Sequence, residues 1–542
     1  MFNENLGSPS LSLFITGDIA TSGTVSVPGL SVSENFTVTP GAVTTVTLPA
    51  SVAVTGTDSI QNKGIHVVAD DEVSVYGLNR VQFTTDAFLG LPVDILGTEY
   101  FNLGYRNINV LNATQFGIVA TEENTSITIN PTVNAGAGRS ANVPYTIILD
   151  QGEAYQLRST LSSPADLSGT LITSDKPIAV FGGHQCANIP AGSVACDHLV
   201  EQLPPTNTWG QSFVTMPLAT RLRGDTFRIL ASAANTEVFI NDVSVATLNP
   251  GQFHERIIDG PAIITATGPV LVAQYSNGSS FDGVTSDPFM MLIPPFEQFL
   301  GNYTVTTPAS GFNTNYVNVV APSAAVGGIN LDGAPIPAAS FSSIGSSGFS
   351  GAQVPVSLGS HNLIGSLPFG VFVYGFDSFD SYGYPGGQSL AEVAIVTSLQ
   401  LSPQTATNPV GTEHCVDGLV TDQNGDPVPG VRVDYSVTGV NPNAGFANAD
   451  VNGIAQYCYT GSNPGFDFIE GAVGALTDSV TKEWISGARV CDANRNGVID
   501  RDDLRLISRA RGQLAQPGDL RDADRDGRIT PNDVKICTTR LD

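Results

Sequence analysis

The chain has 542 residues, of which only 13% are charged, and its formal net charge is −27. This length exceeds what one hydrophobic core can organise, and about three to five domains are expected at ~100–200 residues each. The abundance of Gly and Pro and the scarcity of Lys indicate a mainly β, turn-rich protein with little helix. The acidic balance disfavours nucleic acid and anionic membranes as partners, and it favours divalent cations.

The ends of the chain and its cysteines bear on the cellular compartment. No run of ~18 apolar residues occurs, so the sequence predicts no membrane-spanning segment. The opening MFNENLGSPSLSLFITG has the pattern of folded protein, so we expect that a signal peptide was removed or that Met1 is not the biological start. Six cysteines in three local pairs predict three disulfides and a secreted, extracellular or cell-surface protein. Six cysteines allow other pairings, and the one chosen here keeps each pair within one apparent module: Cys186 with Cys196, Cys415 with Cys458, and Cys491 with Cys537.

A strand pattern recurs four times in the first 395 residues. Each copy has a turn, an alternating apolar run and a Gly or Ser, which is typical of a strand with one buried face. The copies are DDEVSVYGLN (70–79), DKPIAVFGGH (175–184), TGPVLVAQYS (267–276) and LPFGVFVYGF (367–376). They predict four related β modules in series, at roughly 1–105, 106–219, 220–311 and 312–395. Sandwich-like modules are the first choice and a propeller-like ring is the second.

The first three copies are each followed by a connector that begins with an aspartate and contains a proline. We interpret Asp86, Asp197 and Asp287 as repeated turn or cap residues, with a binding site as the alternative. The histidines are scattered, and neither a nucleophile elbow nor a phosphate loop occurs, so the sequence predicts no enzyme.

One cluster of metal-ligand types lies in HQCANIPAGSVACDH. His184, Cys186, Cys196 and His198 would suit zinc in a reducing compartment. In an oxidising compartment a disulfide between the two cysteines is the preferred interpretation, with zinc left open.

The connectors and repeats also carry a resemblance. NKGIHVVADDEVSVYGLN, TTDAFLGLPVDILGTEY, SDKPIAVFGGHQC and CDHLVEQLPP resemble the amino-terminal region of IgG Fc-binding proteins, which also occurs in bacterial surface and secreted proteins. The resemblance covers roughly residues 10–395. The family name implies immunoglobulin binding, but these framework motifs assign no binding residues.

Residues 396–487 have a different character, with short strands and a turn every 8–12 residues. This spacing predicts an Ig-like sandwich, in which Cys415 and Cys458 would face each other across the two sheets. DQNGDPVPGV (422–431) and DVNGIA (450–455) resemble bacterial Ig-like domains of the invasin and intimin type. Such domains are mostly spacers, so the resemblance implies an extracellular stalk or connector.

Residues 488–542 contain two acidic runs, DANRNG and DADRDG, which start 30 residues apart. Twelve-residue calcium loops need oxygen ligands at positions 1, 3, 5, 7, 9 and 12 and a glycine at position 6. The two runs meet this pattern and predict two Ca²⁺ ions, with Ile499 and Ile529 at position 8 paired in a short β bridge. The predicted ligands are Asp492, Asn494, Asn496, the Val498 carbonyl, Asp500 and Asp503 in the first loop, and Asp522, Asp524, Asp526, the Arg528 carbonyl, Thr530 and Asp533 in the second.

Two such loops with aspartate at position 12, and an amphipathic helix after the first, resemble a type I dockerin, a small α-helical, paired EF-hand-like domain. The resemblance implies that loop positions 10 and 11 and the following helix contact a cohesin-like β domain. The matching residues are Arg501 and Asp502 at positions 10 and 11 of the first loop, Arg505 on the helix that follows, and Pro531 and Asn532 at positions 10 and 11 of the second loop. The two copies differ, which argues against a symmetric dual binding mode.

Together these features predict an extracellular bacterial structural protein that assembles through a calcium-folded tail. The partner would be a cohesin-like domain or another copy of this chain, giving a homo-oligomer or a fibre. The alternative is an adhesin whose first 395 residues bind a glycan or a protein. An enzyme carried by a dockerin is disfavoured, since no paired-carboxylate motif is apparent. The tail could also pack within the same chain as an end cap.

Overall fold

The computed structural model describes residues 1–107, 112–160, 164–308, 311–345, 347–390, 396–422, 425–428, 431–450, 452–474, 476–485 and 489–542. The described part is mainly β, as predicted, with two short α-helices. The chain divides into two compact units, Met1–Val393, called the head below, and Ala394–Asp542. Residues 391–395 and 486–488, where the sequence sets domain limits, and parts of the 422–431 turn lie outside the described residues.

The first two modules of the head are sandwiches of two antiparallel sheets, because alternating apolar residues give each strand one buried face. In the first, the sheet β4-β1-β7-β8 packs on β3-β2-β6. Its strands are β1 (Ser10–Thr16), β2 (Thr21–Val27), β3 (Val32–Val38), β4 (Thr44–Leu48), β6 (His66–Ala69), β7 (Ser74–Val81) and β8 (Thr84–Gly90). In the second, β16-β15-β10-β13-β5 packs on β12-β11-β14-β9. Its strands are β5 (Ser59–Gln61), β9 (Glu99–Phe101), β10 (Thr114–Ala120), β11 (Thr125–Asn130), β12 (Tyr145–Leu149), β13 (Ala154–Arg158), β14 (Leu171–Ser174), β15 (Ile178–Ala187) and β16 (Asp197–Leu203).

The third and fourth modules are each organised by one long strand that pairs along its length with several others. In the third module this strand is β22, and in the fourth it is β30. The third module has β17 (Gly210–Thr215), β18 (Asp225–Ala231), β19 (Thr236–Ile240), β20 (Val243–Leu248), β21 (Phe253–Ile258), β22 (Ala262–Tyr275) and β23 (Met290–Ile293). The fourth has β24 (Leu300–Thr306), β25 (Thr314–Pro322), β26 (Asn330–Leu331), β27 (Ala334–Pro335), β28 (Ser342–Ser343), β29 (Phe349–Val356), β30 (Ser360–Asp377) and β31 (Asp380–Pro385).

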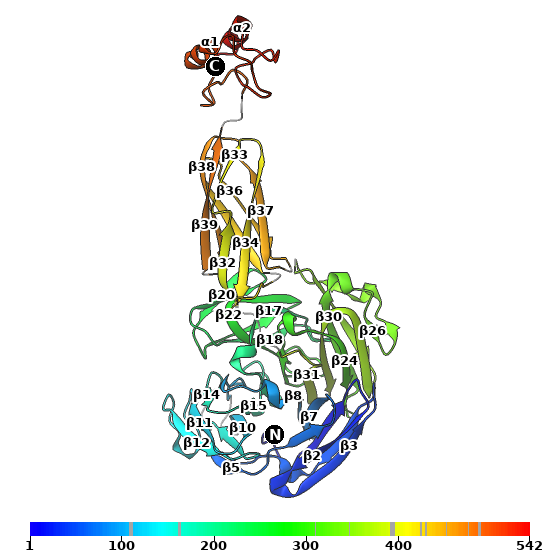
Figure 1. Cartoon of the computed structure of the whole chain (residues 1–542). Helices are drawn as coiled ribbons and strands as arrows, with labels where there is room; N and C mark the ends of the chain where they lie inside the picture. Colours follow the sequence, from blue (N-terminus) through cyan, green and yellow to red (C-terminus); the bar gives the residue numbers. More distant parts are fainter. Residues whose placement is uncertain are drawn as a thin grey trace. The chain divides into compact units, whose positions relative to one another are not determined.

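The four modules close into a ring. The last strand of each module lies at the centre, where β8 contacts β16 and β31, and β23 contacts the same two strands. Figure 1 shows the modules following one another around the head, from blue through cyan and green to yellow-green. The ring closes where the Tyr76 hydroxyl of the first module donates to the carbonyls of Thr304 and Gly386 in the fourth. The sandwich-like sheets are therefore confirmed, and their arrangement is the ring of the second alternative.

Strand pairing moves the module limits that the sequence suggests. β9, β17 and β24 each follow a connector proline, and each pairs with a strand of the next module. β5 pairs with β13, so it also belongs to the second module by its hydrogen bonds. The limits at 105, 219 and 311 therefore fall too late, because the repeat is visible in sequence whereas the pairing of short edge strands is not.

The Ig-like domain is a sandwich of a three-stranded sheet, β32-β34-β37, and a five-stranded sheet, β33-β39-β38-β35-β36. Its strands are β32 (Val396–Ser402), β33 (Thr405–Pro409), β34 (Glu413–Asp422), β35 (Arg432–Gly439), β36 (Asn443–Asn448), β37 (Ile454–Thr460), β38 (Gly465–Val473) and β39 (Leu476–Ile485). Trp484, Tyr435 and Val416 are among the side chains of its core.

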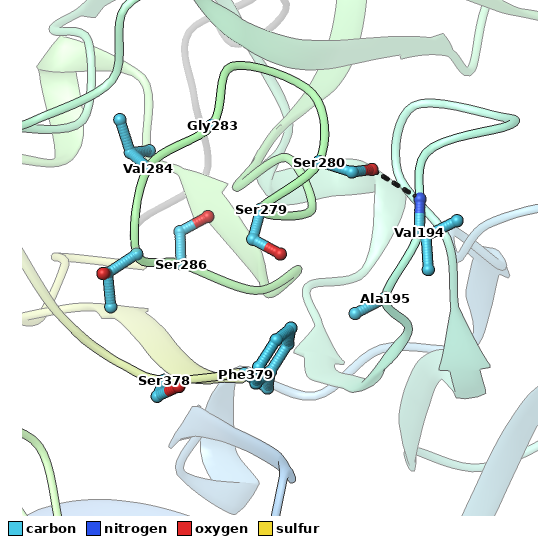
Figure 2. A pocket seen from close by; sticks show the side chains of 10 residues that line it. Val194, Ala195, Ser279, Ser280, Gly283, Val284, Ser286, Ser378 and Phe379 are labelled. Carbon is cyan, nitrogen blue, oxygen red and sulfur yellow. Dashed lines mark hydrogen bonds between the residues drawn. The ribbon is translucent and has the colours of Figure 1, made fainter.

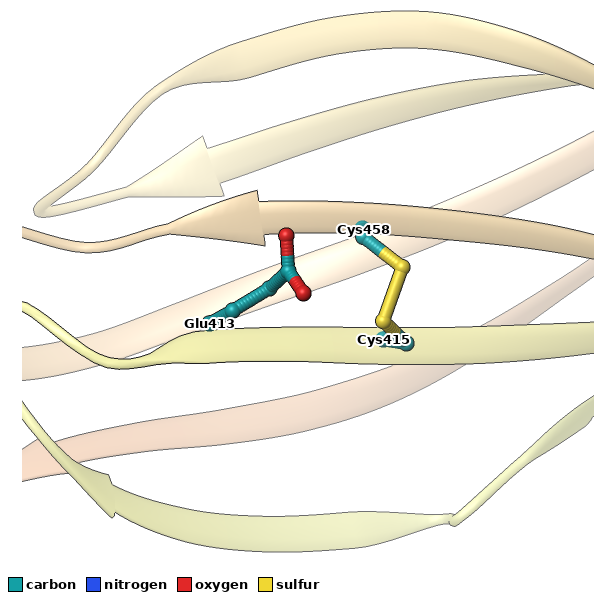
Figure 3. Close-up of side chains that lie close together, drawn as sticks. All are labelled: Glu413, Cys415 and Cys458. Carbon is teal, nitrogen blue, oxygen red and sulfur yellow. A yellow bond between two sulfur atoms is a disulfide. The ribbon is translucent and has the colours of Figure 1, made fainter.

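The disulfide of this domain differs from the prediction. Cys415 and Cys458 are bonded, but they are direct partners on the adjacent strands β34 and β37 of one sheet (Figure 3). The expectation that the bond would join the two sheets is therefore wrong. The cysteines occupy the solvent-facing positions between core residues such as Val416 and Tyr457, so the bond clips two neighbouring strands outside the core.

The tail, residues 489–542, carries the two helices, α1 (Arg501–Arg509) and α2 (Pro531–Thr538), which contact each other. Each begins with a capping box: Asp500 caps α1, Thr530 caps α2, and the aspartate at the third helical position bonds back to the cap residue. The small core holds Ile499, Ile507 and Ile529 and the bonded Cys491–Cys537 pair. A core of this size is marginal alone, so the disulfide is one of the constraints that such a domain needs.

Candidate functional site

The first loop of the tail folds around two buried aspartates. The Asp492 carboxylate accepts hydrogen bonds from the backbone N–H groups of Asn496 at 3.0 Å and Gly497 at 2.9 Å. The Asp503 carboxylate accepts from Asn494 and Asp500, both at 2.9 Å. Asp492 and Asp503 stand at positions 1 and 12 of the predicted calcium loop, so the local sequence brings both ends of the loop together.

The second loop repeats this arrangement. Asp522 accepts from Asp526 at 3.2 Å and Gly527 at 2.9 Å, and Asp533 accepts from Thr530 at 2.7 Å. Gly527 has φ +84°, as the sharp turn at position 6 requires, and Gly497 in the first loop has φ +87°. Two loops thus reach the same hydrogen-bonded geometry, because each depends on short-range spacing alone.

The donor set of the second loop fits a hard cation. Carboxylate oxygens of Asp522, Asp524 and Asp533 all lie within 4.8 Å of one another. Burial alone would raise the pKa of Asp533, but hydrogen bonds from the backbone N–H groups of Thr530, Ala523 and Asp524 outweigh burial. The pKa of this carboxyl is therefore below its usual value, and the group stays ionised. Clustered anionic oxygens that point into one loop are the ligands that Ca²⁺ prefers. In the first loop Asn494 and Asn496 stand where the second has Asp524 and Asp526, so amide oxygens would contribute there.

One detail of the loops differs from expectation. Ile499 and Ile529 are buried, but their backbones do not pair with each other. Ile529 exchanges hydrogen bonds with the loop after α1, accepting from Gly512 at 2.7 Å and donating to Gln513 at 3.0 Å, whereas Ile499 bonds to Asp542. The segment after α1 thus occupies the place of the predicted bridge.

The residues that the dockerin resemblance assigns to partner binding are accessible. Arg501, Asp502 and Arg505 on α1 are exposed, as are Pro531 and Asn532 on α2. Arg505 donates to Asp502 at 2.6 Å in an exposed ion pair. Arg501 and Asp502, like Pro531 and Asn532, occupy loop positions 10 and 11 and also begin the two helices, and Arg505 lies about one turn further along α1. An ion that fixes the loops would therefore also fix these side chains.

The zinc alternative in the head is excluded by the disulfide between Cys186 and Cys196. His184 and His198 are buried, and burial lowers their pKa values to about 3 and about 4. His184 bonds to Asn107 at 3.1 Å and His198 to Asn79 at 3.2 Å. Both histidines are therefore neutral, hydrogen-bonded core residues.

The three connector aspartates are not turn residues. Asp86 lies within β8, Asp197 begins β16, and Asp287 precedes β23; all three are buried beside the ring axis. Asp86 accepts from the backbone N–H groups of Val200 at 3.0 Å and Met290 at 3.2 Å, and so links three inner strands. The fourth module supplies Asp380, which sequence reasoning missed. Its signal was weak: SFDSYGYPGG keeps an aspartate followed by a proline, without the apolar connector of the other copies.

These features define a β-rich protein with three disulfides, as is usual in an oxidising compartment. A family model described as "IgGFc binding protein" matches residues 86–375, and the chain belongs to this family. A human IgGFc-binding protein is 30% identical to it over 342 residues, which are 61% of this chain and 6% of that protein. The chain thus spans a small part of this relative. The residues that match the family model, 86–375, lie within the head.

Solved structures give weaker likenesses. The D0–D1 domain of intimin is 17% identical, covering 33% of this chain and 86% of that structure, with a TM-score of 0.14. The Escherichia coli adhesin FdeC is 13% identical, covering 50% of this chain and 96% of that structure, with a TM-score of 0.15. Scores this low carry no argument about fold or function. None of the helices in the described part of the chain is long and apolar enough to cross a membrane.

Proposed function

We propose that this chain is an extracellular binding and assembly protein whose tail takes up two Ca²⁺ ions and then docks onto a β domain. The observation that supports this most directly is the carboxylate cluster of Asp522, Asp524 and Asp533, held by backbone N–H groups. An ion there would remove the mutual repulsion of the three carboxylates and stabilise the loop against unfolding. The first loop, with its matching hydrogen bonds, would take the second ion.

The docking surface would be formed by the first turns of α1 and α2. Arg501 and Asp502 occupy positions 10 and 11 of the first loop where Pro531 and Asn532 occupy those of the second, so the two halves present different chemistry. A partner would therefore bind in one orientation. We propose a cohesin-like β domain or another copy of this chain as the partner, the latter giving an oligomer or a fibre.

Charge supports binding to an acidic partner. Residues 491–542 hold 10 Lys and Arg and 10 Asp and Glu, so the net charge of −27 belongs to the rest of the chain. Two Ca²⁺ ions would make the tail positive while the head stays acidic. Attraction between exposed charges is screened over a Debye length of about 8 Å at physiological ionic strength, so association should weaken as salt is added.

The test uses the full chain in calcium and in chelator. Sedimentation velocity measures self-association, and capture from the source's extracellular fraction, with identification of the captured protein, tests for a cohesin-like partner. Asp533→Ala should abolish both at moderate calcium, and Arg505→Glu should abolish both while calcium is still bound. Arg540→Glu, an exposed charge outside the helix starts, serves as the matched control. If the chain binds calcium yet stays monomeric and captures no β domain, docking in trans is wrong and the tail is an end cap.

A second candidate function is that of an adhesin, favoured by the family to which the head belongs. The name of the human relative refers to the Fc region of immunoglobulin G. Surface plasmon resonance of immobilised Fc and of a glycan array against the full chain would test this. The Asp533→Ala variant should bind equally well if the head alone is responsible.

A further inference from the structure

One end of the ring axis opens into a pocket of about 340 Å³. Figure 2 shows its lining on three separate segments: Val194 and Ala195, the loop from Ser279 to Ser286, and Ser378 with Phe379. The first two segments are joined by hydrogen bonds between Val194 and Ser280, one from the Val194 N–H to the Ser280 hydroxyl at 2.7 Å. Each of the three segments leads directly into one inner strand of a different module.

A buried aspartate follows each of these segments. Asp197 comes two residues after Ala195, Asp287 directly after Ser286, and Asp380 directly after Phe379. Their exposed fractions are 0%, 1% and 5%. Four of their six carboxyl oxygens have no hydrogen-bond partner in the protein: Oδ2 of Asp197, both oxygens of Asp287 and Oδ1 of Asp380. Buried polar atoms are nearly always paired, so this concentration of unpaired acceptors indicates a missing partner.

The three carboxyls lie close enough to act on one another. Burial raises the pKa of Asp287, and the charge of Asp380 raises it further. Burial also raises the pKa of Asp197, and the charges of Asp287 and Asp380 add to that rise. Two guanidinium groups reach this trio, but neither supplies the missing partners. Arg221 lowers the pKa of Asp287, yet it is paired with Asp282 at 2.7 Å. Burial raises the pKa of Asp380 to about 6, and the Thr85 side chain and the Arg80 guanidinium offset only part of that rise.

We propose that Asp197, Asp287 and Asp380, with the pocket beside them, form a divalent-cation site suited to Ca²⁺. Hard cations prefer carboxylate, hydroxyl and water oxygens, and Ca²⁺ accepts six to eight of them in irregular geometry. The oxygens of this trio do not all come within 4.8 Å of one another, as those of Asp522, Asp524 and Asp533 do. The ion would therefore be held partly through water, for which the pocket next to the three aspartates in the chain has room.

This site has a structural consequence that differs from that of the tail loops. Two of its ligands, Asp197 and Asp380, begin β16 and β31, and Asp287 lies just before β23, so one ion joins the second, third and fourth modules at the axis. The Ser381 hydroxyl already donates to the Asp287 carbonyl at 2.6 Å and fixes two of the ligand strands together. Calcium would thus stabilise the head as a ring, independently of docking by the tail.

The test uses the full chain with Asp492, Asp503, Asp522 and Asp533 all changed to alanine, so that the tail loops bind no calcium. Equilibrium dialysis with radioactive calcium should then show one ion per chain, and calcium should raise the melting temperature of the head. Asp287→Asn in this background should lose the ion and the thermal shift, whereas Asp94→Asn, an exposed acid outside the axis, should keep both. Asp380→Asn provides a second variant if Asp287→Asn fails to fold. Absence of bound calcium in the background chain, or equal binding by both aspartate variants, overturns the proposal.

Discussion

The two tail loops differ at their third position. Exchanging the residue there should change the stability of the tail in opposite directions with and without calcium. The second loop has Asp524, whereas the first has Asn494. Asp524 lies within 4.8 Å of both Asp522 and Asp533. Two unit charges at that distance repel by about 0.9 kcal/mol even at the dielectric constant of water. Without calcium, Asp524→Asn should therefore stabilise the tail by about 2 kcal/mol at low salt.

With calcium the same substitution should weaken binding. A carboxylate about 2.4 Å from Ca²⁺ contributes about 3.5 kcal/mol of attraction at the same dielectric constant. The relieved repulsion of about 2 kcal/mol is the same with and without the ion, so it cancels from the binding free energy, and calcium binding at the second loop should weaken by about 3.5 kcal/mol, which is roughly a few hundredfold. Relative to the unfolded chain the two effects oppose each other, so the calcium-loaded tail should lose about 1.5 kcal/mol of stability. The asparagine at the same position of the first loop shows that the loop geometry itself tolerates the amide.

The assay is helix ellipticity of the full chain during thermal unfolding, once in chelator and once in calcium, together with calorimetric calcium titration. Asn494→Asp in the first loop is the matched control and should show the reverse pattern: a less stable calcium-free tail and tighter binding. A shift of the same sign in chelator and in calcium would refute the electrostatic reasoning, because the carboxylate would then act through the loop fold alone.

Three further predictions concern the disulfide, the ring closure and a buried acid. Replacing Cys491 and Cys537 by serine opens a loop with a sequence separation of 46, and should cost the tail about 4 kcal/mol, seen as a lower melting temperature at fixed calcium. Tyr76→Phe removes the buried hydroxyl whose single proton is shared between the Thr304 and Gly386 carbonyls, and should destabilise the head by about 1–3 kcal/mol in urea unfolding; an unchanged midpoint would mean that this contact does not hold the ring. Burial raises the pKa of Asp225 from 3.8 to about 7, so its contribution to stability is complete below pH 3.8 and is lost as pH rises through 7. Asp225→Asn should reduce the fall in head melting temperature between pH 5 and pH 8, and an unaltered pH profile would show that another group causes it.

The sequence alone determined the features that depend on short-range spacing. The three disulfide pairs follow from cysteines that share a local module, and all three are confirmed. The geometry of the two tail loops follows from aspartate, asparagine and glycine at fixed intervals, because a twelve-residue loop closes on its own backbone N–H groups. Alternating apolar residues gave the mainly β class and the sandwich-like sheets, although occupancy of the loops by calcium stays a prediction.

Only the tertiary structure decided which strands meet. Alternation tells which face of a strand is buried but not which strand lies beside it, so the cross-strand position of Cys415 and Cys458 within one sheet could not be predicted. The same reason hid the ring, in which aspartates from segments about 90 to 110 residues apart converge on one axis. Asp86, Asp197 and Asp287 look like turn residues in sequence, and Asp380 lacks their connector. Their shared environment exists only because four modules close on one another, and closure depends on contacts such as that of Tyr76 with the last module, which join the two ends of the head.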